Sequence, residues 1–109
     1  MSTRKLVTVL TTLPDEGAAQ ALARVLVSER LAACVQRTAI ASTYRWKGRI
    51  EDAAEVLLLI KSTDDLVDSL RARLIALHPY EVAEFVVLTS DVASQAYVDW
   101  VRSACIGSD

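Results

Sequence analysis

Residues 77–84, with the sequence LHPYEVAE, bring together several side chains that can do chemistry. They include His78, which is the only histidine, and Tyr80, Glu81 and Glu84. An imidazole can bind a transition metal or transfer a proton near neutral pH, and a neighbouring carboxylate can assist either role. Because Glu81 and Glu84 are three residues apart in a segment expected to be extended, their side chains should face opposite ways. This spacing argues against a paired-carboxylate acid–base site.

Three interpretations of His78 follow from its position before a proline. Pro79 has no amide hydrogen and disfavours helical geometry at the preceding residue, so a helix should end at His78. The ring can then cap the last helical turn, where a partial positive charge suits the exposed carbonyls. It can instead line a pocket with Tyr80, Glu81 and Glu84. As a metal ligand it would need partners from another subunit, because one imidazole alone rarely holds a transition metal.

Three further residues complete the set of candidate cleft residues. Trp46 lies near an expected hairpin tip, where it suits subunit packing or stacking on a ligand. Lys61 is the last residue of an expected apolar strand. It can bind an anion beside the next helix, extend its charge to solvent, or pair with Glu84. Cys34, in the run LAACV, is typical of a packed thiol. The candidate cleft set is therefore Trp46, Lys61, Tyr80, Glu81, Glu84 and Cys34.

The composition restricts the class of protein. The chain has 109 residues, 52% hydrophobic residues and a net charge of −2, which predicts one domain over residues 1–109. No basic patch with interleaved aromatic residues and no apolar run of about 20 residues is present, so nucleic-acid binding and a membrane span are not expected. Nothing directs export, which favours the cytoplasm and reduced cysteines. Nucleophile and phosphate-loop motifs are absent, which argues against an enzyme.

Hydrophobic periodicity predicts four strands and three helices. We expect strands at residues 5–12, 33–46, 49–61 and 82–89, and helices that begin near residue 14, at residue 62 and near residue 90. Thr12 should cap the first helix, and Ser62 with Asp65 should form a capping box for the second. Gly48 should form the turn between the second and third strands.

This order predicts an α+β fold, namely a ferredoxin-like βαββαβ arrangement with an added C-terminal helix and a four-stranded antiparallel sheet. Its helices would cover one face of the sheet only. The third strand contains LLLI, which is too uniformly apolar to leave one face in water. A closed homo-oligomer that covers the second face is therefore expected.

The segments VLTTLPDE, ERLAACV, YRWKGRIE, EVLLLIKST, LHPYEVAE and YVDWV, in this order, resemble the CutA divalent-cation-tolerance family from about residue 6 to residue 103. The resemblance implies a tight trimer, a link to metal tolerance and reported copper binding. The copper site proposed in that family combines a first-strand cysteine with two adjacent histidines before the Pro-Tyr pair. These positions correspond to Thr11, Leu77 and His78 here, so only His78 is a metal-binding residue type.

The sequence thus predicts a non-enzymatic, cytoplasmic homotrimer with weak binding of copper or another divalent metal at His78 and no required cofactor. A regulatory ligand would bind in clefts between subunits. The alternative is a small-molecule enzyme whose site is shared between subunits, with His78 as acid–base and Glu84 or Lys61 assisting.

Overall fold

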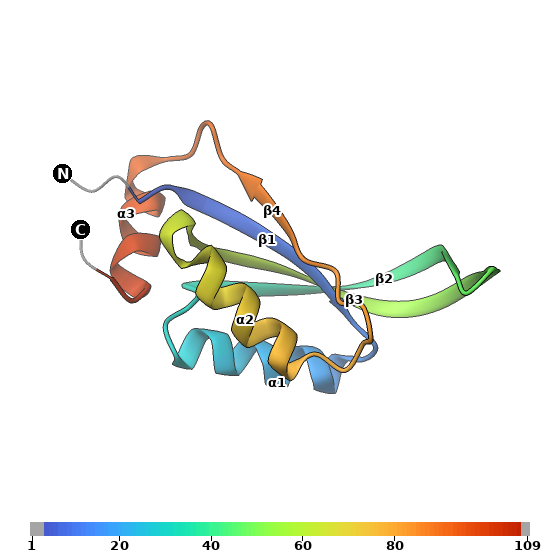
Figure 1. Ribbon diagram of the computed structural model, residues 1–109. Helices are drawn as coiled ribbons and strands as arrows, with labels where there is room; N and C mark the ends of the chain where they lie inside the picture. Colours follow the sequence, from blue (N-terminus) through green and yellow to red (C-terminus); the bar gives the residue numbers. More distant parts are fainter. Residues whose placement is uncertain (1–3, 108–109) are drawn as a thin grey trace.

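Four strands form a single antiparallel sheet in the computed structural model, which describes residues 4–107. Along the chain the elements are β1 (Leu6–Leu13), α1 (Glu16–Ser28), β2 (Cys34–Trp46), β3 (Arg49–Thr63), a 3-10 turn η1 (Asp64–Leu66), α2 (Val67–Leu77), β4 (Val86–Thr89) and α3 (Gln95–Ala104). The strand order is β2-β3-β1-β4 (Figure 1). The predicted ferredoxin-like fold with an extra C-terminal helix is therefore confirmed.

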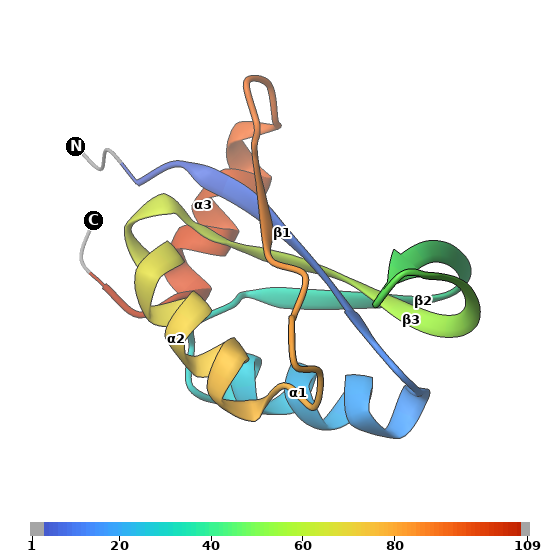
Figure 2. The same ribbon diagram turned by 45° about the vertical axis from the view of Figure 1, so that its right-hand side comes forward.

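Helices α1 and α2 cover one face of the sheet (Figures 1 and 2). Because successive side chains of a strand alternate between faces, Leu58 and Ile60 point under these helices and are fully buried. Leu57 and Leu59 point to the other face and remain half-buried. The prediction of a face without helices is confirmed for the part of the sheet that α3 does not reach.

Helix α3 packs at the end of the sheet remote from the β2–β3 turn (Figure 1). It forms a second, smaller core cluster in which the buried residues are Leu6, Ala33, Leu66, Val101 and Cys105. The longest helix described is α1, with 13 residues. Within residues 4–107, no helix is long and apolar enough to cross a membrane.

The hairpin of β2 and β3 extends beyond the rest of the sheet. Strand β1 pairs with β3 only as far as Leu13 opposite Val56, and residues 40–55 continue alone as a projecting arm (Figure 2). Lys47 and Gly48 both have positive φ, at 49° and 79°, which is the geometry of a two-residue turn of type I′. The predicted turn at Gly48 is confirmed.

Both predicted helix caps were wrong. Asp15, not Thr12, caps α1, and its Oδ1 accepts from the Ala18 amide at 2.8 Å. Ser62 lies in β3, which pairs with β1 up to Thr63, and its hydroxyl donates to the Leu31 carbonyl at 2.7 Å. Strand pairing over these extra residues delays the start of the helix, so Ser62 and Asp65 do not form a capping box.

The last two elements are shorter than predicted. Strand β4 has four residues rather than eight, because it pairs only with Val7–Leu10 of β1. Helix α3 begins after its cap, Ser94, rather than near residue 90. The end of α2 was predicted correctly, since His78 follows Leu77 in extended geometry with ψ of 136°.

Candidate functional site

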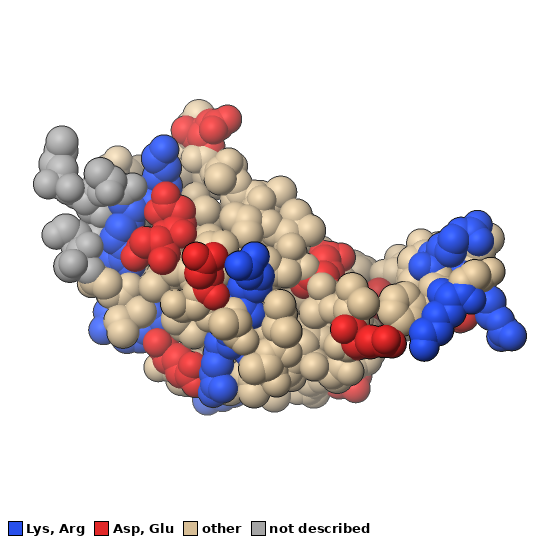
Figure 3. Space-filling view, in the orientation of Figure 1, with Lys and Arg blue, Asp and Glu red and all other residues tan. Residues whose placement is uncertain are grey.

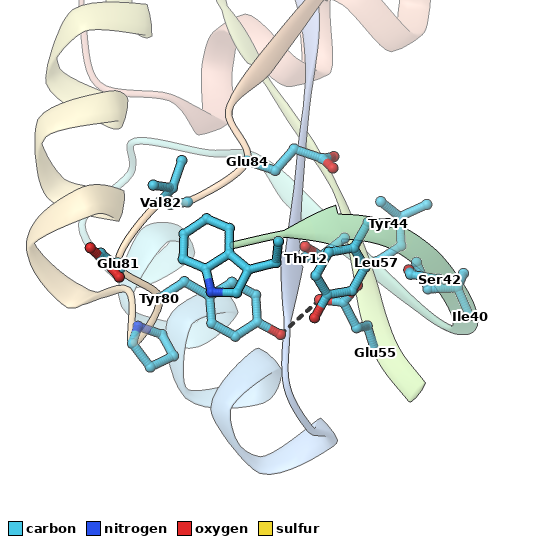
Figure 4. Close-up of a pocket in the computed structure, with 13 residues that line it drawn as sticks. Thr12, Ile40, Ser42, Tyr44, Glu55, Leu57, Tyr80, Glu81, Val82 and Glu84 are labelled. Carbon is cyan, nitrogen blue, oxygen red and sulfur yellow. Dashed lines mark hydrogen bonds between the residues drawn. The ribbon is translucent and has the colours of Figure 1, made fainter. Parts of the chain in front are cut away.

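A hollow of about 690 Å³ lies on the uncovered face of the sheet, where the arm leaves the body (Figure 4). One wall comes from the strands and the other from the loop after α2. Along β2, Ile40, Tyr44 and Trp46 share this face because of the two-residue period of a strand. The lining residues are Thr12, Ile40, Ser42, Tyr44, Trp46, Glu55, Leu57, Pro79, Tyr80, Glu81, Val82, Ala83 and Glu84.

Tyr80 and Glu55 join the two walls. The Tyr80 hydroxyl donates to Glu55 Oε2 at 2.7 Å (Figure 4). Burial raises the pKa of Tyr80, and the hydrogen bond to the Glu55 carboxylate raises it further. The phenol therefore stays protonated at neutral pH and acts as a donor that fixes Glu55, not as a nucleophile or base.

His78 fastens the loop to strand β1. Its Nε2 lies 2.8 Å from the Thr12 carbonyl oxygen, and its Nδ1 accepts from the Tyr80 amide at 3.1 Å. A carbonyl only accepts and an amide N–H only donates, so these partners require the neutral tautomer with the proton on Nε2. Both ring nitrogens are thus engaged with backbone groups. The ring is not among the residues that line the hollow.

The interpretation of His78 as a side-chain helix cap is not supported by its hydrogen bonds. Only its backbone amide bonds to the end of α2, with 3.3 Å to the Ile75 carbonyl. The ring instead bonds to the Thr12 carbonyl of β1 through Nε2, and this hydrogen bond holds the loop after α2 against that strand.

Within one subunit, Thr11, Leu77 and His78 do not supply three metal ligands. The Thr11 hydroxyl is fully buried and Leu77 has no donor atom. Over residues 4–107, no group of three or more His, Cys, Asp or Glu side chains is placed to hold a metal ion. A metal at His78 would have to displace one of its two hydrogen bonds, and the assignment of His78 as a ligand stays a prediction.

Four of the six candidate cleft residues come together in the hollow, namely Trp46, Tyr80, Glu81 and Glu84. Glu81 Oε2 lies 3.7 Å from Lys47 Nζ on the arm. Glu84 is exposed and makes no ion pair with any residue that the structure describes.

Lys61 and Cys34 lie elsewhere. They face each other on β3 and β2 at the end near α3, and Lys61 Nζ lies 5.7 Å from the centre of the Tyr97 ring. Lys61 lies six positions along β3 from Glu55 in the hollow, or about 20 Å away. The suggested pairing of Glu84 with Lys61 was therefore wrong, because β3 runs past the hollow before it reaches Lys61.

Sequence reasoning missed Glu55 and Tyr44 as site residues. A signal was present for Glu55, which lies two residues before Leu57 and so shares the uncovered face. Its partner Tyr80 is 25 positions away, and only the path of the loop brings the two side chains together.

Comparison with known proteins identifies the family of this chain. A sequence model described as "CutA1 divalent ion tolerance protein" matches residues 7–104. The chain belongs to the CutA1 family. The CutA1 resemblance found from the sequence segments is thereby confirmed.

Individual CutA relatives agree with this assignment. The divalent-cation tolerance protein CutA of Thermus thermophilus is 44% identical over 95 residues, which cover 86% of this chain and 92% of the relative. Human Protein CutA is 45% identical over 92 residues, or 84% of this chain, and the chain spans about half of the human protein (51%). The structure of CutA from Synechococcus elongatus superposes on this chain with a TM-score of 0.90 at 42% identity. The match covers 95% of this chain and 93% of the Synechococcus chain.

Proposed function

We propose that this protein acts in divalent-cation tolerance as a non-enzymatic, cytoplasmic homotrimer, with ligand-binding clefts where the hollow meets a neighbouring subunit. Membership of the CutA1 family supports the tolerance role, and the observation that carries the assembly is the apolar sheet face that no helix covers. On that face Val86 and Leu88 are 44% and 48% exposed, and Leu10, Leu57 and Leu59 are half-buried.

Removing such a surface from water is favourable by about 25 cal/mol per Å² of apolar area. Monomeric proteins rarely leave a continuous apolar patch of this kind open. A closed ring of identical subunits would cover every copy of the face and leave none for further association. Tyr44 and Trp46, which are 44% and 38% exposed on the arm, lie beside this face and would line the cleft next to the neighbouring subunit.

Two features support a non-enzymatic role. Both nitrogens of His78 are engaged with backbone groups, and the raised pKa of Tyr80, caused by burial and by Glu55, keeps that phenol protonated. The groups best suited to move a proton in or beside the hollow therefore hold the loop in place. The alternative of an enzyme with a site shared between subunits would need His78 to leave both of its partners.

Light scattering on the purified protein tests the assembly. At micromolar concentration we expect a mass three times the 11.9 kDa of one chain. Leu59→Glu, on the uncovered face, should lower the mass to that of a monomer. Ile75→Glu is the matched control, since Ile75 is 54% exposed on α2, and it should leave the trimer intact. A monomeric wild type would refute the proposal.

Copper calorimetry tests the metal side of the proposal. We expect weak binding by the wild type, because copper has to compete with the two hydrogen bonds of His78, and a further loss in His78→Ala. Identical isotherms for the two proteins would remove His78 as a ligand.

A strain without the gene should grow less well than its parent in excess copper or zinc, and equal growth would argue against the tolerance role.

A further inference from the structure

We propose that the hollow binds an organic ammonium ion, that is, a positively charged amine carried on an aliphatic body. This inference rests on the proposed function for the setting of the cleft and names the class of ligand that the cleft takes. It is carried by the charge of the hollow, by its aromatic side chains and by the position of one lysine of the chain itself.

The charge of the lining is entirely negative. Three of the thirteen lining residues are carboxylates, Glu55, Glu81 and Glu84, and none is a lysine, arginine or histidine. Basic side chains gather at the tip of the arm (Figure 3), where Arg45, Lys47 and Arg49 are exposed, and only Lys47 of these three forms an ion pair with a lining residue among residues 4–107. A concave site lined by one sign of charge attracts ligands of the opposite sign.

Aromatic rings supply the second element of cation recognition. Tyr44, Trp46 and Tyr80 all line the hollow, and the face of an aromatic ring attracts an ammonium group placed within about 6 Å of its centre. Carboxylates together with ring faces favour an ammonium group over a neutral molecule of the same shape.

Lys47 shows this recognition within the chain. Its Nζ lies 5.6 Å from the centre of the Trp46 ring and 3.7 Å from Glu81 Oε2. An ammonium group is thus already held between one ring and one carboxylate of the lining. Lys47 is 71% exposed, so a competing amine from solvent can take its place.

A bare divalent ion fits the hollow less well than an organic cation. The carboxylates of Glu55, Glu81 and Glu84 lie on different sides of the hollow (Figure 4), and no three ligand side chains among residues 4–107 converge on one point. A volume of about 690 Å³ is in the range of sites for small organic molecules. Ile40, Leu57 and Val82 offer apolar contacts for the body of such a ligand.

Glu84 is the carboxylate best placed to receive the ligand. Glu55 already accepts from Tyr80 and Glu81 already faces Lys47. Glu84 is exposed and makes no ion pair within the described part of the chain, so binding an amine there breaks no existing pair.

Tryptophan fluorescence tests the proposal directly. The chain has two tryptophans, so Trp100→Phe leaves Trp46 as the only reporter and serves as the parent protein. We expect 1,5-diaminopentane to change its fluorescence saturably at millimolar concentration or below. Neither 1,5-pentanediol, which has the same length without charge, nor calcium chloride should reproduce this change.

Variants of the parent locate the site. Glu84→Gln should weaken diamine binding about fivefold, which is the effect of losing one exposed ion pair of about 1 kcal/mol. Lys47→Gln should tighten binding, because it removes the competing ammonium group. Asp68→Asn is the matched control, since Asp68 is a 93% exposed carboxylate paired with Arg71 on α2, and it should not change the affinity.

Four results would overturn the inference: no saturable response to the diamine, an equal response to the diol or to calcium, equal affinities of the Glu84 and Asp68 variants, or unchanged or weaker binding in Lys47→Gln. Light scattering on the same samples separates this inference from the proposed function. A monomer that still binds the diamine refutes the trimeric function and keeps the site. A trimer that does not bind the diamine refutes the proposed binding site but not the proposed trimeric function.

Discussion

Thr11 is a polar residue that the core does not satisfy. It lies in β1, its side chain is fully buried, and its Oγ1 has no hydrogen-bond partner among residues 4–107. A buried hydroxyl without a partner has lost its water contacts and gained nothing in return.

Replacing Thr11 by valine should therefore stabilise the protein. The two side chains have the same shape, and the change removes the unpaired hydroxyl, so we expect the free energy of unfolding to rise by about 1 kcal/mol in urea denaturation. Thr63→Val is the control with the opposite sign, because the buried Thr63 hydroxyl accepts from Arg4 at 3.2 Å. A loss of stability in Thr11→Val would show that the hydroxyl has a partner in solution.

Asp65 links stability to acid pH. Partial burial raises the pKa of this carboxyl, but hydrogen bonds with Thr63 and Arg4 and the charge of Arg4 outweigh it, so that the pKa lies below its usual value. The native state then binds a proton less readily than the unfolded chain. This contribution is complete above the unfolded pKa of about 3.9 and is lost as pH falls through that value towards the native one.

Asp65→Asn should make the free energy of unfolding depend less on pH in this range. Wild type should lose more stability than the variant between pH 5 and about pH 3, measured by urea denaturation at a series of pH values. Asp68→Asn, which changes the exposed carboxylate 3.4 Å from Arg71, should keep the wild-type slope. Parallel curves for wild type and Asp65→Asn would contradict the assignment.

At the scale of elements, one arginine links the end of α1 to the end of α3. Arg30 follows α1 with φ of 60°, in the left-handed region where glycine is usual. Its guanidinium donates to the carbonyls of Ser103, Ala104 and Cys105 at 3.0–3.3 Å. These are carbonyls at the end of α3 that have no later turn to bond them, so the side chain compensates for its unfavourable backbone.

Arg30→Gly should separate these two effects. Glycine relieves the left-handed backbone, which favours the variant by up to about 1 kcal/mol, but it removes three hydrogen bonds to α3. We expect amide hydrogen exchange in α3 to become about tenfold faster while exchange in α1 stays unchanged. Exchange rates in α3 equal to those of the wild type would show that these bonds contribute nothing to its anchoring.

At the scale of the whole molecule, the shape is unusual for so short a chain. The described residues extend over 50 × 26 × 21 Å, because the arm of residues 40–55 continues past the last pair of β1 and β3. A two-stranded ribbon standing alone in water is marginally stable. Both the arm and the apolar sheet face would gain from contact with the neighbouring subunits that we propose.

Thermal unfolding should therefore depend on protein concentration. If the subunits are folded only when associated, dilution favours dissociation and the unfolding midpoint falls by mass action. Calorimetry over a hundredfold range of concentration measures this shift. A midpoint that does not move would argue for a stable isolated subunit, against the trimer.

Much of the fold followed from the sequence alone, because its determinants are local. Strand and helix periodicity placed the elements in the correct order, Gly48 marked the hairpin turn and Pro79 marked the end of α2. The uniformly apolar run LLLI in β3 also indicated that the sheet face away from the helices would be apolar. The errors arose where tertiary pairing outweighed a local signal, as at Ser62, which strand pairing keeps in β3.

The tertiary structure alone decided which of the candidate residues meet and which further residues join them. Tyr80 meets Glu55, and His78 meets the Thr12 carbonyl, across 25 and 66 positions of the chain, and strand register placed Lys61 and Cys34 at the other end of the sheet. Periodicity shows which face a side chain occupies, but not how far along that face it lies from a residue of another element. That distance depends on strand register and on the path of the loop, which arise only when the whole chain packs.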